Sequence, residues 1–147
     1  MPTEVEGSSP MTLPIARPGT FLVVDDSALH HQMYRLIFSR GSLAGSTVYF
    51  ATNGKEGYGL LAAHPELTLV LLDLNMPEMN GLEVLERRRA EALHPHIPIV
   101  LVTTEGSVED EARGRAAGAW EYLRKPFQPA DVELLVSRAV AQSATTA

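Results

Sequence analysis

The sequence predicts an α/β domain: a doubly wound (βα)5 arrangement with a five-stranded parallel sheet. Five short, mostly apolar segments alternate with five segments of helical character, which is the pattern of strand–helix units in such a sheet. The run from Leu67 to Asp73 is too short for a core helix and suits a strand buried on both faces. The 147 residues leave room for one domain, expected at 20–141, with a flexible N-terminal tail at 1–19 and a C-terminal tail at 142–147.

The expected elements follow one another in regular order along the chain. We expect strands at 21–25, 47–51, 67–73, 97–103 and 120–125. We expect helices that begin at Ser27 and at Pro129, and helices over 55–63, 82–93 and 108–117. The strand at 47–51 combines β-branched and aromatic residues, which favours a place near the edge of the sheet.

The first two helices differ in the stability that the sequence predicts. Asp26 or Ser27 can cap the first turn of the first helix. Its expected apolar face is formed by Leu29, Met33, Leu36 and Ile37. The second helix contains Gly57 and Gly59, each of which costs about 0.5–1 kcal/mol relative to alanine. We therefore expect the second helix to be the least stable one, and mobile.

The third and fourth helices have thin apolar faces, and the last helix has a clear one. The expected inward residues are Leu82, Leu85 and Ala92 in the third helix, Val108, Ala112 and Ala116 in the fourth, and Val132, Leu135, Val136 and Ala139 in the last. Small side chains bury little area, so we expect the fourth helix to be held weakly. The run Arg87–Arg89 reads mainly as a solvated face, although at least one of these arginines must lie beside the apolar stripe and extend its charged end to water.

Composition excludes several classes of function. The net charge of −6 argues against broad binding to the phosphate backbone of a nucleic acid. No apolar run approaches the roughly 20 residues that cross a bilayer, and the N-terminus has no signal-peptide pattern, so we expect no membrane association. The absence of cysteine excludes disulfides and fits a cytoplasmic location.

Polar residues stand at the ends of four expected strands. Asp25 and Asp26 end the first strand, Asp73 the third, Thr103 the fourth and Lys125 the fifth. In a parallel sheet all of them emerge at the same edge, where ligands bind in open α/β folds. Each residue alone has an ordinary explanation, such as a turn cap or a surface lysine, but those explanations fit the set of five poorly.

This set of residues favours phosphoryl chemistry. Three crowded carboxylates repel one another unless a cation joins them, and a pocket of oxygen ligands suits Mg²⁺. Lys125 and the Thr103 hydroxyl would add a positive charge and a donor for a phosphoryl group, and a carboxylate such as Asp73 can attack phosphorus. The histidines show no ligand-like spacing, and we assign no metal role to His30, His31, His64, His94 or His96.

The chain resembles the receiver domains of two-component response regulators, in particular the stand-alone, chemotaxis-regulator-like ones. The resemblance covers about 21–141. The matching motifs are the acidic pair Asp25-Asp26, D-L-N-M-P-E-M-N-G at 73–81, Thr103, and A-G-A-W-E-Y-L-R-K-P-F at 117–127. The resemblance implies a flavodoxin-like fold and a phosphoprotein that is not an enzyme, although it takes part in its own phosphorylation and dephosphorylation.

The family resemblance also implies a role for each matching metal and phosphoryl ligand. Asp73 would be the phosphoacceptor. Asp26 and Asp73 would bind Mg²⁺ through their side chains, Asn75 through its backbone carbonyl, and Asp25 through a metal-bound water. Lys125 would pair with the phosphoryl group, with a cis peptide bond to the proline that follows it.

Thr103 and Tyr122 resemble the switch pair of the family, in which the hydroxyl moves toward the phosphoryl group and the aromatic ring follows it inward. Trp120 lies two residues before Tyr122, so we expect it on the same side of the strand and sensitive to the switch. Two residues depart from the family pattern. Thr104 replaces a smaller residue and is expected to narrow access to the phosphoryl group, and Arg88 replaces an apolar helix residue.

The expected partners are proteins. A sensor histidine kinase or a histidine phosphotransfer protein would supply the phosphoryl group, and a downstream protein would bind through about 108–139, since no output domain follows the last helix. Two alternatives stay open. A metal-dependent aspartyl phosphatase would place a second acid two residues after the nucleophile, where this chain has Asn75. A receiver-like scaffold would act without phosphate, which the intact set of site residues disfavours.

Overall fold

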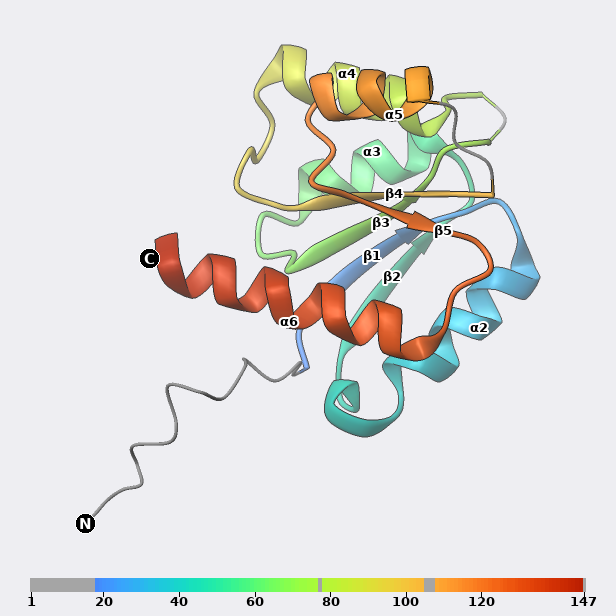
Figure 1. Ribbon diagram of the computed structural model, residues 1–147, viewed down its shortest axis with the longest axis vertical. Coiled ribbons are helices and arrows are strands. Elements are labelled where there is room, and N and C mark those ends of the chain that lie inside the picture. Colours follow the sequence, from blue (N-terminus) through green and yellow to red (C-terminus); the bar gives the residue numbers. More distant parts are fainter. Residues whose placement is uncertain (1–17, 77, 105–107, 147) are drawn as a thin grey trace.

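The computed structural model describes residues 18–76, 78–104 and 108–146. These residues form one sheet with strand order β2-β1-β3-β4-β5, and every neighbouring pair of strands is parallel (Figure 1). The predicted doubly wound sheet is therefore confirmed, and so is the edge position of the strand at 47–51. Most of the predicted N-terminal tail, 1–19, lies outside the described residues.

The elements alternate along the chain as the sequence predicted. They are β1 (Thr20–Val24), α2 (Ala28–Phe38), the short 3₁₀ helix η2 (Gly41–Leu43), β2 (Thr47–Ala51), α3 (Gly54–Ala63), β3 (Leu69–Asp73), α4 (Gly81–Glu91), β4 (Ile99–Thr103), α5 (Val108–Ala116), β5 (Glu121–Arg124) and α6 (Pro129–Thr146). The last helix continues to Thr146, so it extends through most of the segment that was predicted as a tail.

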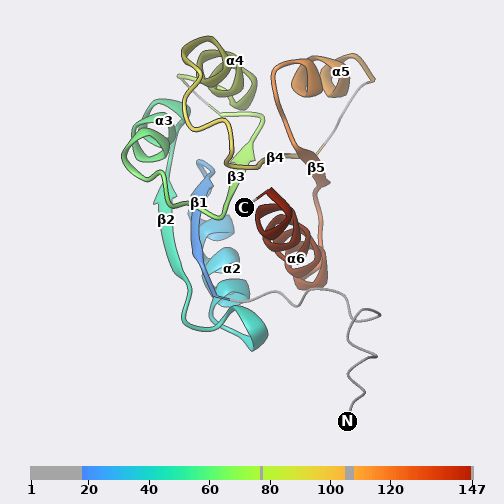
Figure 2. The same ribbon diagram turned by 90° about the vertical axis from the view of Figure 1, so that its left-hand side faces the viewer.

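Helices cover the sheet on both faces. Figure 2 shows α2 and α6 on one side of the strands and α3, α4 and α5 on the other. Each central strand alternates its side chains between the two resulting cores: Phe21 and Val23 face α2 and α6, whereas Leu22 and Val24 face α3 and α4. Because all the side chains of β3 and β4 are buried, these strands are apolar almost throughout, as expected for a sheet covered on both faces.

Side-chain caps fix where three of the helices begin. Ser27 accepts a hydrogen bond from the backbone N–H of His30, and Asn53 accepts one from Glu56. Asn80 forms a capping box with Glu83, in which each side chain accepts from the other residue's backbone. These caps place the first turns of α2, α3 and α4 directly after the loops that leave β1, β2 and β3.

The predicted inward faces of α2, α4 and α5 are partly wrong. In α2, Leu29 and Leu36 are 72% and 54% exposed, while the aromatic residues Tyr34 and Phe38 are buried with Ile37, because the larger rings fill the space beside the sheet. In α5, Ala112 and Ala116 are exposed, and the buried residue is Gly114. The predicted inward residue Ala92 is also exposed, because it adopts the left-handed conformation that ends α4.

Arg88 is buried and takes the place that an apolar residue was expected to fill. Its side chain is 6% exposed, and its guanidinium donates to the backbone carbonyls of Leu93, His94 and Ile97 at 2.6–2.9 Å. The prediction that one of the three neighbouring arginines lies beside the apolar stripe is therefore confirmed. The guanidinium does not extend to water, however, because the loop that follows α4 supplies the acceptors.

Gly57 lies where α3 approaches β1. A Cβ atom on Gly57 would lie 2.7 Å from both Cγ atoms of Val24, which is closer than carbon atoms can pack. The glycine is therefore needed for the close packing of α3 on the sheet, although it costs conformational entropy.

Among the described residues, no helix combines the length and the apolar character needed to cross a membrane.

Candidate functional site

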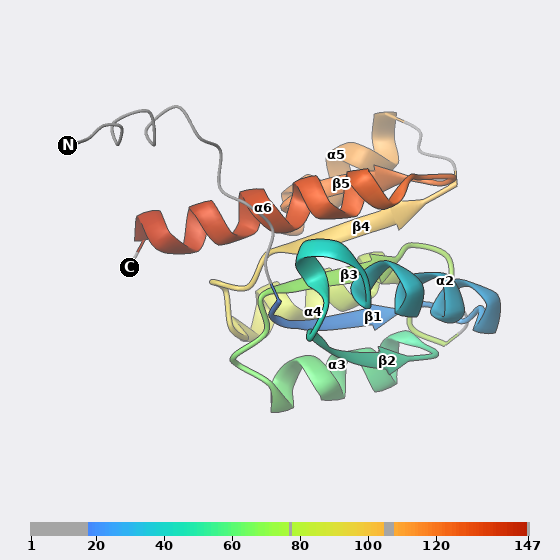
Figure 3. The ribbon, with the colours of Figure 1, turned by 90° about the horizontal axis from the view of Figure 1, so that it is seen from below.

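All the strands end at one edge of the sheet (Figure 3), and the predicted site residues meet at this edge. The register pairs Val24 of β1 with Leu72 of β3, and Asp73 of β3 with Val102 of β4. Asp25, which follows β1, is therefore level with Asp73 on the neighbouring strand. Lys125 follows β5 in the same way, and its backbone N–H donates to the carbonyl of Thr103 at 2.8 Å.

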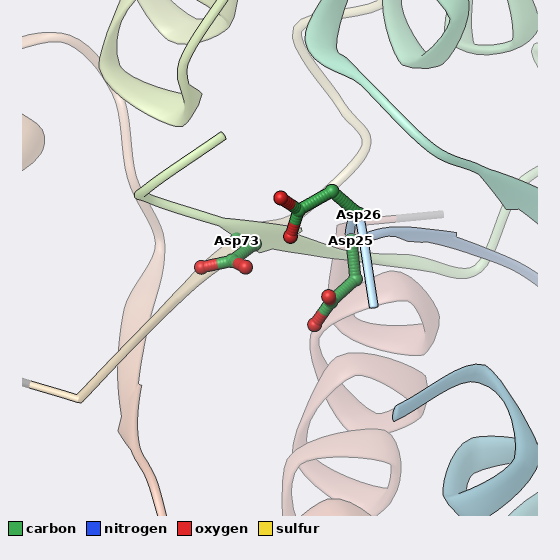
Figure 4. Close-up of side chains that lie close together, drawn as sticks. All are labelled: Asp25, Asp26 and Asp73. Carbon is green, nitrogen blue, oxygen red and sulfur yellow. The ribbon is translucent and has the colours of Figure 1, made fainter. Parts of the chain in front are cut away.

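Three carboxylates form an acidic cluster at this edge. Figure 4 shows Asp25, Asp26 and Asp73 close together at the ends of the two central strands. One carboxylate oxygen from each lies within 4.8 Å of the others, with Asp25 and Asp73 buried and Asp26 exposed. Opposite ligands of an octahedral Mg²⁺ at about 2.1 Å are about 4.2 Å apart. The oxygen-only donor set and its spacing therefore fit Mg²⁺ with small side-chain adjustments.

Lys125 bridges the two buried carboxylates. Its Nζ lies 3.3 Å from Oδ2 of Asp25 and 3.4 Å from Oδ2 of Asp73. The Lys125 side chain is itself only 11% exposed. The ammonium therefore offsets part of the repulsion between the two acids. The Lys125–Pro126 peptide bond is cis, as the family resemblance implied.

The environment of Asp73 favours its protonated form. Burial raises the pKa of the Asp73 carboxyl above its ordinary value, and the nearby Asp25 raises it further. Lys125 acts in the opposite direction, as does the hydrogen bond from the backbone N–H of Asn75 to Oδ1 of Asp73 at 3.2 Å. A divalent cation in the cluster would add a second positive charge and favour the carboxylate.

The rest of this edge is formed by the loop after β3, with Asn75, and by the end of β4, with Thr103 and Thr104. Asn75 lies two residues after the end of β3, and its backbone turns back toward Asp73 through the hydrogen bond above. Thr103 is buried at the end of β4, and Thr104 is exposed in the next position. The structure thus brings every predicted ligand to this edge, and the roles assigned to all of these residues stay predictions.

Tyr122 lies against α5. Its hydroxyl donates to the backbone carbonyls of Asp110 at 2.9 Å and Glu111 at 3.1 Å. Gly114 makes this position possible, because a Cβ there would overlap the Tyr122 hydroxyl. The guanidinium of Arg115 lies over the Tyr122 ring, 5.5 Å from its centroid. In this structure the predicted switch residue therefore connects β5 to α5.

Trp120 does not share the side of Tyr122, so that prediction is wrong. Trp120 packs on the core shared with α2 and α6, and Tyr122 packs on the core shared with α3 and α4. The alternation of side chains applies only within a strand, and β5 begins at Glu121, one residue after Trp120. A fluorescence change at Trp120 would therefore report on the α6 side of the sheet.

His30 is a site residue that the sequence analysis missed. Its Nδ1 lies 2.9 Å from Oδ2 of Asp25 and 3.2 Å from Nζ of Lys125. The available signal was the cap: Ser27 accepts from the backbone N–H of His30, so this residue occupies the first turn of α2, next to the end of β1. The other four histidines make no contact with the cluster's carboxylates among the described residues, although Nε2 of His31 lies 2.6 Å from the backbone oxygen of Asp25.

The chain is similar in sequence to proteins of one family. The family described as "Response regulator receiver domain" matches residues 21–137. The chain is 38% identical over 108 residues to the chemotaxis protein CheY homolog of Campylobacter jejuni, covering 74% of this chain and 82% of that protein. It is 32% identical over 125 residues to the transcriptional regulatory protein SrrA of Staphylococcus aureus, covering 85% of this chain and 49% of that protein.

A solved structure supports the same assignment. The CheY-like response regulator receiver domain protein of Methanospirillum hungatei superposes with a TM-score of 0.78 at 26% identity, covering 88% of this chain and 99% of that one. The fold, the family match and the acidic cluster all support the assignment to receiver domains. This chain belongs to the response regulator receiver domain family.

Proposed function

We propose that this protein is a single-domain response regulator that is phosphorylated on Asp73 by a sensor histidine kinase or a histidine phosphotransfer protein, with Mg²⁺, in the cytoplasm. The observation that carries the proposal is the convergence of the acidic cluster with Lys125, whose Nζ lies 3.4 Å from Oδ2 of Asp73. The chain spans 82% of the C. jejuni chemotaxis protein and 49% of SrrA.

The transfer joins an Asp73 carboxylate oxygen to phosphorus while the phosphorus–nitrogen bond of the donor phosphohistidine breaks and its electron pair returns to the imidazole. Lys125 moves from the carboxylates to a phosphoryl oxygen, which costs little rearrangement because its ammonium already lies between them. Mg²⁺, when bound, neutralises the charge of the phosphoryl oxygens. Asp26, Asp73 and the backbone carbonyl of Asn75 would hold the ion, with Asp25 acting through a bound water.

The signal then reaches the surface formed by about 108–139. The Thr103 hydroxyl donates to the new phosphoryl group, and Tyr122 leaves α5 for the space that Thr103 vacates. This exchange releases the two backbone carbonyls that the Tyr122 hydroxyl contacts now, so the equilibrium between two packings of α5 changes. A downstream protein binds one of these packings better than the other.

The test is phosphorylation by acetyl phosphate, followed by intact mass. We expect one phosphoryl group on the protein in the presence of Mg²⁺, none after chelation of the metal, and none on Asp73→Ala. A pull-down with and without a phosphoryl mimic then identifies partners, with the same variant as control. If neither acetyl phosphate nor a cognate kinase modified the protein, it would be a scaffold instead. Turnover of a generic phosphate ester that depends on Asp73 would indicate a phosphatase.

Thr104 is proposed to limit access to the phosphoryl group. Its side chain is exposed beside the buried Thr103, so its bulk lies at the entrance of the site. We expect phosphorylated Thr104→Ala to lose its phosphoryl group faster than the parent, in a time course of intact mass. Equal or slower loss from the variant would exclude this role.

A further inference from the structure

His30 introduces an imidazole at the border of the acidic cluster. The side chain is 32% exposed, whereas that of Asp25 beside it is 2% exposed. Nδ1 of His30 lies within hydrogen-bond distance of both Oδ2 of Asp25, at 2.9 Å, and Nζ of Lys125, at 3.2 Å. A charged carboxylate, an ammonium and a ring nitrogen therefore meet at one place.

The Asp25 carboxylate is nearly saturated with donors. A carboxylate offers about four lone-pair positions. Oδ1 accepts from the backbone N–H of Ser27 at 2.8 Å, and Oδ2 accepts from Lys125 at 3.3 Å and lies next to His30. Because Asp25 is buried, water does not supply these contacts. Little acceptor capacity is left for a metal ion or for a water bound to it.

The contacts identify which form of the imidazole fits. A ring nitrogen either donates or accepts, a carboxylate only accepts, and an ammonium only donates. The shorter contact of Nδ1 is to the carboxylate. A hydrogen on Nδ1 makes that contact a charge-assisted hydrogen bond, and Lys125 keeps two carboxylate acceptors. Without the hydrogen, the Nδ1 lone pair would face the negative Oδ2 atom.

We propose that His30 is a positioning residue that competes with Mg²⁺ for the Asp25 carboxylate and so lowers the affinity of the site for the metal. The hydrogen bond from Nδ1 takes up part of the negative charge that would attract the ion. When Lys125 moves to a phosphoryl oxygen, His30 remains as a donor to Asp25. This inference rests on the proposed function, because it assumes that Asp25 serves the metal.

The direct test is a Mg²⁺ titration followed by backbone amide NMR shifts, at about pH 8, where an ordinary imidazole is neutral. We expect His30→Leu to bind Mg²⁺ more tightly than the parent by about tenfold or more, since one hydrogen bond to a charged group is lost. His30→Asn places an amide N–H near the position of Nδ1, and its affinity should stay within about twofold of the parent. His30→Met serves as a second apolar variant if His30→Leu does not fold.

A matched control removes an imidazole far from the site. His96 is exposed in the loop before β4, where Nε2 lies 3.2 Å from the backbone oxygen of Pro65, and His96→Leu should leave the affinity for Mg²⁺ unchanged. The inference is overturned if the apolar variants bind Mg²⁺ as the parent does or more weakly, or if His30→Asn behaves like His30→Leu.

A second measurement separates this inference from the proposed function. In acetyl phosphate labelling, the Mg²⁺ concentration at half-maximal rate should fall in His30→Leu, while the rate at saturating Mg²⁺ should match the parent. If the parent is never phosphorylated but the difference in Mg²⁺ affinity persists, the proposed function fails and the role of His30 stands. If the parent is phosphorylated but the affinities are equal, only the role of His30 fails.

Discussion

The neighbouring helices α4 and α5 cover the same face of the sheet but are attached to it in different ways. α4 begins with a capping box, buries Leu82, Val84 and Leu85, and carries the buried Arg88 in its last turn. α5 has only Gly114 buried among the helix residues whose side chains are described, and the single O–H donor of Tyr122 is shared between its Asp110 and Glu111 backbone carbonyls. α4 is therefore firmly packed, whereas its neighbour α5 is attached partly through Tyr122, a residue that is predicted to move.

The other polar contacts of α5 include a hydrogen bond from the Arg89 guanidinium of α4 to the backbone carbonyl of Ala116 at 2.6 Å, and two exposed ion pairs that add little to its stability. Arg115 pairs with Glu121 of β5 at 3.5 Å, and Arg113 approaches Glu86 of α4 at 3.9 Å. Exposed pairs of this kind contribute about 0–1 kcal/mol. Tyr122 therefore joins α5 to β5, and α4 is the firmly packed neighbour of α5.

The largest expected effect is on the fixed helix. Arg88→Met keeps an apolar stem but removes the guanidinium from the carbonyls of Leu93, His94 and Ile97, of which that of His94 keeps the Ile97 backbone N–H as a donor. The loss should lower the free energy of unfolding by about 2–4 kcal/mol. Urea denaturation measures the loss. Arg87→Met is the control, because the Arg87 side chain is 46% exposed and should cost about 0–1 kcal/mol. Equal losses in the two variants would show that the buried arginine does not fix α4.

The next effect tests the fit between α5 and Tyr122. In Gly114→Ala the added Cβ would meet the Tyr122 hydroxyl and lie 2.8 Å from Leu101, which should cost about 1–3 kcal/mol of stability. With Tyr122→Ala as background the ring is gone, so the same substitution should cost less than in the parent or even stabilise the helix. A double-mutant cycle by urea denaturation measures this coupling, and additive effects would contradict it.

A smaller effect is expected from removal of the hydroxyl alone. Tyr122→Phe keeps the ring but leaves the carbonyls of Asp110 and Glu111 without this donor, which should cost about 1 kcal/mol. Amide hydrogen exchange should then become about fivefold faster in α5 and stay unchanged in α4. Equal acceleration in both helices would mean that α4 and α5 open together, and the contrast between them would be lost.

The sequence predicted the site better than it predicted the helix faces, for a physical reason. Strands that run parallel place their carboxyl ends together whatever surrounds them, so Asp25, Asp73 and Lys125 could be grouped from their positions alone. The faces of α2 and α5 depend on what lies opposite. Leu29 is as apolar as a core residue, yet Tyr34, five residues later, fills the core instead.

Two further features have the same origin. The sequence predicted one arginine of the run 87–89 beside the apolar stripe, but it did not predict that the guanidinium of Arg88 stays buried. The three carbonyl acceptors come from the loop after α4, and that loop conformation is not a periodic property of the sequence. In the sequence, His30 is not spaced from another candidate ligand as metal ligands are. It reaches Asp25 only because the Ser27 cap fixes the first turn of α2. Both contacts are tertiary, and a hydrophobic pattern does not encode them.

The smallest effect that we expect concerns Asp73, the last residue of β3. Burial is the chief reason that the pKa of Asp73 is raised in the folded protein. Folding therefore favours the protonated carboxyl. The folded protein loses this contribution to its stability as pH rises through the folded pKa, because Asp73 then ionises. In Mg²⁺-free buffer, Asp73→Asn should therefore raise the free energy of unfolding at neutral pH. The gain should vanish when pH falls below the ordinary carboxyl range. Urea titrations at several pH values measure both, and a gain that grew toward acid pH would show that pairing with Lys125, and not burial, dominates at Asp73.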